Sequence, residues 1–441
     1  MKNRFMLSAG VLAAVVLVTA LAAAAGGRAR AGVQTKAAGI SGTITFDGIW
    51  TASSGQKQFQ DVISAFNKVY PNVHVNYKPV GNNLPTVLAT AVAGGHPPDM
   101  ADIAQPGTVK QLATEGKLKP ITYATGTINS NFASAWRQLG TFDNKLYALV
   151  FKAANKSLVW YNVPAFKAAG ISPPKTWAQL LSDAKTLKAS GVPAYSIGGA
   201  DGWTLTDLFE NIYLRTFGPA KYDLLSQHKI KWTDPSVTKA LTTMGQVIGD
   251  SANLAGGASG ALQYGFNDSV TNAFGTPPKA AMVFEADFVG GVITSSTKAK
   301  AGSGYNTFTF PQITAGPDAS AVEIAGDLFV TFRDNPAIEA FVKFLATAPA
   351  AEAWAKQGGF GTGNHNMPAS TYPDAITRAT EGPILSAKSV VFDMSDEQPP
   401  AFGGTTGQGE WGLFQQFLKS PKDISGIQKK LEAAATAAYK K

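Results

Sequence analysis

Hydrophobic positions in the early part of the chain follow two periods in turn. Residues 43–46 and 73–77 alternate as β-strands do, whereas apolar positions in 59–69 and 84–92 recur at helical spacing. Residues 97–103 then predict a loop that leads into a third strand. The order strand, helix, strand, helix, strand is typical of a parallel sheet with crossover helices.

The loops at the ends of these strands are the expected place for a ligand. In open sheets of this kind, ligands bind beyond the carboxyl ends of the strands. A Gly-, Trp- and Ser-rich loop, Gly48–Gly55, follows the first strand and holds Trp50 and Ser53. Asp102 lies near the end of the third strand, and Asp99 lies at its start, where capping a turn is as plausible as contacting a ligand.

Helix starts mark the rest of the chain. Thr176–Gln179 forms a capping box. Prolines follow Asp234 and Asn335, at the first helical position, where a missing N–H has no consequence. Residues 421–439 predict an alanine-rich helix, and the Gly-, Ala- and Ser-rich segment 256–275 predicts a loop.

Composition places the chain among globular proteins. Its 441 residues are 45% hydrophobic and 15% charged, which excludes a disordered or collagen-like chain. At roughly 100–200 residues per domain, we expect two or three packed units. The formal net charge is +8, but five cations precede the first acid, Asp47, which leaves 8 − 5 = +3 on the remainder. A nearly balanced body lacks the electrostatic footprint of a nucleic-acid partner.

Cysteine is absent from the sequence. This excludes disulfides, thiolate nucleophiles, iron–sulfur clusters and cysteine zinc sites, and also the lipid-bearing cysteine of bacterial lipoproteins. The 4 histidines are scattered, and no two lie within i,i+4 reach, so we expect no histidine-built metal site. We predict neither a metal nor a cofactor.

Residues 1–31 have the layout of a cleavable secretory signal peptide. A basic start is followed by an apolar run over Met6–Ala25 and by an A-x-A pattern at Ala29–Ala31, with Ala25 as a competing cleavage point. A retained membrane anchor is the alternative, since the run approaches the ~20 residues of a spanning helix. We expect an exported protein, soluble or loosely membrane-associated at the extracellular face or in the periplasm, with 32–42 as a linker.

Several collinear segments resemble the extracellular solute-binding proteins of ABC transporters, specifically the carbohydrate-binding family 1. They are AFNKVYPNVHVNY (65–77) with PPDMADI (97–103), Asp143–Leu187, Lys279–Gly291 and Ala325–Phe360. Together they span most of residues 43–440 in the family's order. The FEADF turn and the segment Phe392–Trp411 are most similar to α-glucoside-type binding proteins of actinobacteria.

The resemblance implies an α/β, two-lobed periplasmic-binding-protein fold. Each lobe would be a mainly parallel sheet flanked by helices, with the ligand cleft between the lobes. The chain would cross between them repeatedly, with 43–150 and 303–348 in lobe 1 and 151–302 and 349–441 in lobe 2. The lobes would close on the ligand by a hinge, and the closed form would dock on a membrane permease. We expect a monomer.

A carbohydrate site needs aromatic platforms for the flat CH faces of the sugar and polar groups for its hydroxyls. Trp50, Trp203 and Phe288 are the candidate platforms. For Trp50 the alternative is a core position, and for Trp203 it is packing at the hinge. Phe360 stands in a Gly-rich loop that either approaches the cleft or forms a plain turn. Trp354 is on a helix with apolar partners, and we expect it in the core.

The candidate polar contacts include two closely spaced carboxylates. Glu285 and Asp287 are two residues apart, so both would point to one face of an extended segment. There they could bind vicinal hydroxyls, form a structural pair, or act as the acid/base couple of a glycosidase. Asp327 opens a strand and would contribute from the opposite lobe, whereas Lys152 could equally be solvated. The predicted polar ligand contacts are Ser53, Asp102, Lys152, Glu285, Asp287 and Asp327.

The leading functional hypothesis is a carbohydrate receptor of an ABC importer that captures an α-linked di- or oligosaccharide and performs no chemistry. Its partners would be the sugar and the permease subunits. The alternative is a secreted glycoside hydrolase, which would use two carboxylates about 5 or 6.5–9.5 Å apart. A third class is a receptor for a non-sugar solute such as a polyamine or peptide. A polyamine would require a richly acidic cleft, which Glu285 and Asp287 alone would not supply.

Overall fold

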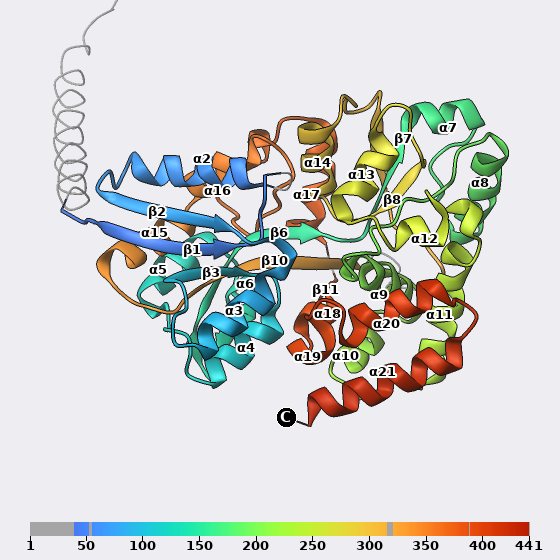
Figure 1. Ribbon diagram of the computed structural model, residues 1–441. Helices are drawn as coiled ribbons and strands as arrows, with labels where there is room; N and C mark the ends of the chain where they lie inside the picture. The colour runs from blue at the N-terminus through green and yellow to red at the C-terminus, as the bar shows by residue number, and fades with distance from the viewer. Residues whose placement is uncertain (1–38, 53–54, 315–320, 388, 441) are drawn as a thin grey trace, which may run out of the picture.

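The computed structural model describes residues 39–52, 55–314, 321–387 and 389–440. The predicted signal peptide, most of the predicted linker and Ser53 lie outside these residues. The described chain forms two lobes, with lobe 1 at the left and lobe 2 at the right of Figure 1. No helix in this part of the chain combines the length and the apolarity that a bilayer crossing requires.

Lobe 1 is built on a six-stranded sheet. Its strands are β1 (Gly42–Gly48), β2 (Val73–Pro79), β3 (Met100–Ile103), β6 (Ala148–Asn155), β10 (Val322–Thr331) and β11 (Val390–Phe392). They follow the order β11-β10-β3-β1-β2, with β6 paired to β10. Strand β1 pairs in parallel with β2 and β3, as the sequence pattern predicted, whereas β10 runs antiparallel to β3 and β6.

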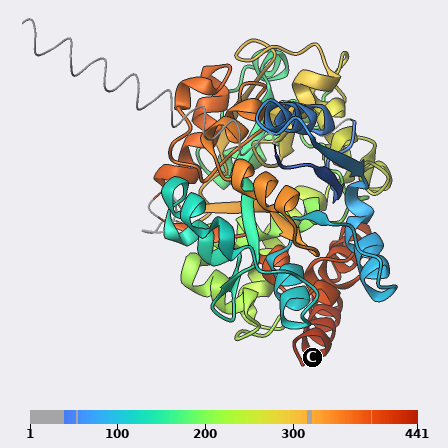
Figure 2. The same cartoon turned by 90° about the vertical axis from the view of Figure 1, so that its left-hand side faces the viewer.

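Helices cover both faces of this sheet (Figures 1 and 2). They are α2 (Gln56–Asn67), α3 (Leu84–Ala93), α4 (Pro106–Thr114), α5 (Thr125–Asn131), α6 (Ser134–Leu139), α15 (Pro336–Leu345), α16 (Ala348–Ala355) and α17 (Ala375–Ser386). Short elements complete the lobe: η1 (Gly81–Asn83), η2 (Thr122–Ala124), η4 (Ala369–Thr371) and the hairpin β4 (Thr141–Phe142)–β5 (Lys145–Leu146). Helix α2 buries Phe59, Val62, Ile63 and Phe66, the stripe that its helical periodicity predicted.

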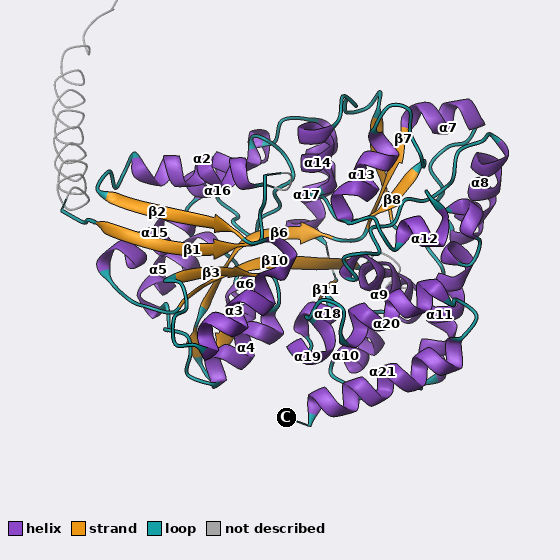
Figure 3. Cartoon of the chain, viewed as in Figure 1, coloured by secondary structure: helices purple, strands orange, loops and turns teal. Residues whose placement is uncertain are grey.

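Lobe 2 is mostly helical, as the colouring of Figure 3 shows. Its strands, β7 (Leu158–Asn162), β8 (Met282–Phe284) and β9 (Tyr305–Thr309), form an antiparallel sheet in the order β8-β7-β9. The expectation of a mainly parallel sheet is therefore wrong for this lobe. The strand–helix alternation that predicts parallel pairing occurs only in residues 43–103, so nothing local specified the pairing in lobe 2.

Thirteen helical segments make up the rest of the described part of lobe 2. They are α7 (Val163–Ala169), α8 (Trp177–Ala189), α9 (Trp203–Phe217), α10 (Pro219–Ser226), α11 (Pro235–Ile248), η3 (Ser251–Asn253), α12 (Gly257–Ala261), α13 (Phe266–Phe274), α14 (Val289–Ser296), α18 (Met394–Glu397), α19 (Pro400–Gly403), α20 (Gly409–Lys419) and α21 (Ile424–Tyr439). The predicted caps of α8, α11 and α15 are present. The predicted loop over 256–275 is wrong, because it contains α12 and α13.

Separate hydrophobic cores define the two lobes. The core of lobe 1 draws on residues 44–153 and 322–392, and that of lobe 2 on residues 158–321 and 391–438. The chain therefore crosses between the lobes after β6, before β10 and near β11.

These crossings differ from the expected lobe boundaries in two places. Tyr305 and Phe310 were expected in lobe 1 but belong to the clusters of lobe 2. Trp354 and Phe360 were expected in lobe 2 but pack in the core of lobe 1. Strand β10 alone carries the chain back into lobe 1, so the return crossing falls later than residue 303.

Candidate functional site

A cleft with two adjoining chambers lies between the lobes. The first chamber has an empty volume of about 870 Å³, and the second has about 720 Å³. The residues that line both chambers are Ile49, Asn82, Lys152, Trp203, Phe288 and Asp327. Because the two chambers share these residues, they form one continuous candidate site. The shared residues come from both lobes.

The lobe 1 wall carries a group of buried charges on neighbouring strands. Lys152 in β6 and Asp327 in β10 are partners in the sheet register, and Lys152 Nζ lies 3.5 Å from Asp327 Oδ2. Asp102, in β3, has 0% of its surface exposed and lines the first chamber. Among the described residues, no side chain donates a hydrogen bond to its carboxylate oxygens, and the backbone amide of Ile49 is the polar group that interacts with them.

Burial is the largest influence on the pKa values of these carboxyl groups. It raises the pKa of Asp102 well above its usual range, and the nearby Asp327 carboxylate adds to the shift. Burial also raises the pKa of Asp327, while the Lys152 ammonium opposes the shift. A carboxyl group with unused hydrogen-bonding capacity in a cleft can accept from, or donate to, the hydroxyls of a polar ligand.

The lobe 2 wall presents aromatic rings. Trp203 is the first residue of α9, and Phe288 lies in the turn that precedes α14. Their ring centroids are 6.0 Å apart at 69°, and Phe266 completes the group at 5.3 Å from Trp203 and 5.1 Å from Phe288. Trp411 of α20 also lines the first chamber, and its Nε1 has no hydrogen-bond partner among the described residues.

The second chamber ends against two tryptophans of lobe 1. Trp50 lines this chamber yet is only 4% exposed, and its ring lies 4.6 Å from that of Trp354. The Tyr77 hydroxyl fixes the loop of Trp50, because it donates to the Trp50 carbonyl and accepts from the Trp50 amide, both at 2.9 Å. Trp50 and Trp354 thus belong to the core and to the chamber lining at once.

Most of the predicted site residues come together in this cleft. Those that line it are Trp50, Asp102, Lys152, Trp203, Phe288 and Asp327. Glu285, Asp287 and Phe360 are not among the lining residues. Phe360 is fully buried, 5.3 Å from the ring of Phe151 and 5.4 Å from that of Trp354. The Gly-rich loop that holds it therefore serves core packing.

The expectation that Glu285 and Asp287 face one surface is wrong, because β8 ends at Phe284 and Asp287 lies in a turn. Glu285 lines a separate cavity of about 230 Å³ within lobe 2, and burial and the neighbouring Asp207 raise its pKa. Asp287 Oδ2 accepts a 2.7 Å hydrogen bond from the backbone amide of Asn155. The two carboxyls are 2% and 1% exposed and lie behind the cleft.

Sequence reasoning missed several lining residues. Asn82, Gln105, Phe266, Asp396 and Trp411 are among them. Gln105 of lobe 1 donates a 3.1 Å hydrogen bond to Asp396 of lobe 2, so these two side chains connect the walls directly. Phe266 was hidden in the segment predicted as a loop. Trp411 ends the segment Phe392–Trp411, which resembles the family. An aromatic residue directly after a Gly-rich stretch was the sequence feature that could have identified it as a ligand contact.

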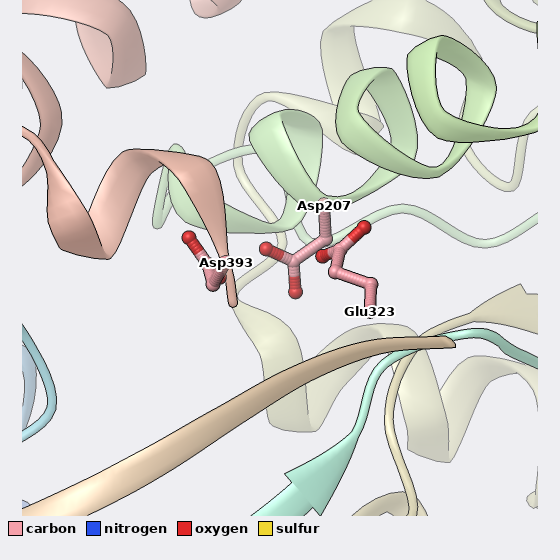
Figure 4. Close-up of side chains that lie close together, drawn as sticks. All are labelled: Asp207, Glu323 and Asp393. Carbon is pink, nitrogen blue, oxygen red and sulfur yellow. The ribbon is translucent and has the colours of Figure 1, made fainter. Parts of the chain in front are cut away.

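A separate group of carboxylates, none of which lines either chamber, is shown in Figure 4. One oxygen from each of Asp207, Glu323 and Asp393 lies within 4.8 Å of the others, and all three residues are buried. This spacing would suit a divalent cation. The ammonium group of Lys156, however, contacts both Asp207 and Asp393.

Two α/β lobes with aromatic and charged walls around a shared cleft define a solute-binding protein. The chain belongs to the bacterial extracellular solute-binding protein family, whose model matches residues 52–352. The resemblance and the two-lobed fold predicted from the sequence are thereby confirmed. Members of this family are the substrate-binding proteins of ABC transporters, which bind a solute and catalyse no reaction, so the hydrolase alternative has no support.

Named relatives agree with this assignment. The chain is 31% identical to the alpha-glucosides-binding periplasmic protein AglE of Rhizobium meliloti, over 88% of this chain and 86% of AglE. It is 29% identical to the osmoprotective compounds-binding protein GgtB of Synechocystis sp., over 80% of this chain and 83% of GgtB. The fold is similar to that of the bacterial solute receptor AcbH, with a TM-score of 0.79, 22% identity and coverage of 91% of this chain and 100% of AcbH.

Proposed function

We propose that the solute is a carbohydrate, specifically an α-linked di- or oligosaccharide, which the protein delivers to the permease of an ABC importer. The observation that carries this proposal is the complementary chemistry of the two walls. Asp102 and Asp327 offer carboxyl groups on one side, and Trp203 and Phe288 offer rings on the other. Sugar CH faces pack on aromatic rings, while hydroxyls pair with carboxyl groups.

The shape of the cleft supports a ligand of more than one sugar ring. The two chambers meet at a shared boundary, so a chain of linked rings could extend from one into the other. The α-linkage is supported by the name of AglE, an alpha-glucosides-binding protein that aligns with 88% of this chain. The proposed contacts are Trp50, Asp102, Lys152, Trp203, Phe288, Asp327 and Trp411.

Capture would involve closure of the lobes about their crossings. A ligand favours the closed state only through contacts that both lobes make with it. The cleft meets this condition, since Asp327 belongs to lobe 1 and Trp203 to lobe 2. We further propose that the protein acts as a monomer, with the closed form recognised by the permease.

A thermal-shift screen tests the proposal. Maltose, trehalose and sucrose serve as α-glucosides, lactose as a β-linked disaccharide, and sorbitol as a polyol without a ring. An α-glucoside at 100 times its Kd should stabilise the folded protein by about 2.7 kcal/mol through mass action. Chromatography after prolonged incubation should find the sugar intact. Stabilisation by spermidine but by none of the sugars would contradict the proposal, as would released monosaccharide.

A further inference from the structure

A cluster of buried charges lies where the chain crosses between the lobes. The cluster consists of Lys156, which directly follows β6, Asp207 in α9, Glu323 in β10 and Asp393, which directly follows β11. In this order, the four residues are 7%, 3%, 0% and 1% exposed. Figure 4 shows that the three carboxylate side chains lie close together. The cluster therefore joins three crossing segments to a helix of lobe 2.

Lys156 is the cation that holds this cluster together. Its Nζ lies 2.9 Å from Asp207 Oδ2 and also contacts Asp393 Oδ2. Its amide donates to the Glu323 carbonyl at 2.9 Å, and its carbonyl accepts from Asn211 Nδ2 at 3.1 Å. Burial disfavours the charged ammonium, but the carboxylates, Asp207 first, raise the pKa of Lys156 well above its usual range.

The same ammonium group reaches the wall of the cleft. Lys156 lines the first chamber, and its Nζ lies 5.4 Å from the ring centroid of Trp203, within the ~6 Å range of a cation–π contact. Trp203 and Asp207 are four residues apart in α9, so their side chains share one face of the helix. One ammonium group thus contacts both the ring in the wall and the carboxylate behind it.

We propose that Lys156 is a positioning residue for the ligand site, which fixes the ring of Trp203 in the cleft wall by tying α9 to the lobe crossings. The inference deepens the proposed function and rests on it where sugar affinity is concerned. Without the ammonium group, Asp207 and Asp393 would lose the cation that they share, and the Trp203 ring would lose its cationic neighbour. The wall would then be less well organised for stacking.

Binding measurements at pH 7.5 with maltose and trehalose test this role. Lys156→Met should weaken the binding roughly tenfold, the upper part of the cation–π range. Lys156→Arg keeps the charge and should restore affinity to within about threefold of the wild type. Lys188→Met is the matched control, since it removes an ion pair of 2.7 Å with Asp250 at an exposed position of the same lobe. Its affinity should not change. Equal affinity of wild type and folded Lys156→Met would overturn the proposal.

A double-mutant cycle separates positioning from general damage. In the background of Trp203→Leu, Lys156→Met should add little further loss of affinity, because the ring that it orients is gone. Fully additive losses would contradict the proposal. If Lys156→Met does not fold, Asp393→Asn replaces it, since this change keeps Lys156 and weakens its hold; a loss of a few-fold in affinity is then expected.

A spectroscopic arm needs no sugar. The near-ultraviolet circular dichroism contributed by Trp203, obtained as the difference from Trp203→Leu, should change in Lys156→Met or Asp393→Asn and not in Lys188→Met. An unchanged Trp203 signal would overturn the proposal even if the wild type bound neither sugar, an outcome that would count against the proposed function alone. Calcium or magnesium should leave the melting temperature unchanged. A rise that EDTA and Glu323→Gln abolish would assign the cluster to a metal ion instead.

Discussion

The two walls of the cleft offer different chemistry and are built in different ways. On the lobe 1 side, Asp102, Lys152 and Asp327 stand on neighbouring strands of one sheet. On the lobe 2 side, Trp203 begins a helix and Phe288 lies in a turn. One wall supplies groups for the edges of a sugar, and the other supplies rings for its faces.

The difference follows from what each kind of group needs from the fold. A buried charge requires a partner at a fixed distance, and adjacent strands provide this, as the register pair Lys152 and Asp327 shows. The burial of an aromatic ring is favourable without a charged partner, so such a ring can stand at the end of a helix. Its orientation then depends on neighbours such as Lys156, 5.4 Å from the Trp203 ring.

The largest expected effect comes from the aromatic wall. Trp203→Ala should weaken the binding of an α-glucoside by about 2 kcal/mol or more, roughly thirtyfold, as expected for a central aromatic anchor. Titration calorimetry measures the loss. Trp177→Phe is the control, because Trp177 packs in the lobe 2 core and does not line the cleft. Equal affinity losses in both variants would abolish the distinction between wall and core.

The carboxyl groups allow a sharper comparison of cleft and interior. Asp102→Asn should reduce affinity about threefold to tenfold, since burial favours the neutral carboxyl, and a hydrogen bond between neutral groups contributes about 0.5–1.5 kcal/mol. Asp287→Asn should leave affinity nearly unchanged but lower the melting temperature, because Asp287 accepts from the Asn155 amide behind the cleft. The reverse pattern in the two variants would place the binding carboxylate in the FEADF turn, as first predicted from the sequence.

The sequence was sufficient for features that depend on local pattern. Alternation and helical spacing predicted β1, α2, β2, α3 and β3, and the strand-end rule placed Trp50 and Asp102 at the cleft. The resemblance added the two lobes and directed attention to Phe288 and Asp327. The position of Asp327 was less accurate, because the sequence placed it at the start of a strand and it lies in the middle of β10.

The remaining features depend on contacts between distant segments. The spacing of Glu285 and Asp287 implied one face only if the strand continued, and the chain turns after Phe284 instead. Lys156 and Asp393 are far apart in the sequence, and only the crossings bring them together. Asp396 stands in a short acidic stretch with Asp393 and Glu397, so nothing local distinguished it from a solvated residue.

The smallest expected effect concerns the support behind the aromatic wall. Burial raises the pKa of Asp207 from 3.8 to about 7, so the folded protein holds a proton there that the unfolded chain releases. Stability from this group is present at low pH and declines as pH rises toward and through 7. Between pH 6 and 7.5, Asp207 alone should lower the free energy of unfolding by about 1 kcal/mol. Chemical denaturation measures this slope, and Asp207→Asn should flatten it.

An unchanged slope in that variant would assign the titration to another buried carboxyl, such as Glu285. The charged support of Trp203 would then be independent of pH in this range.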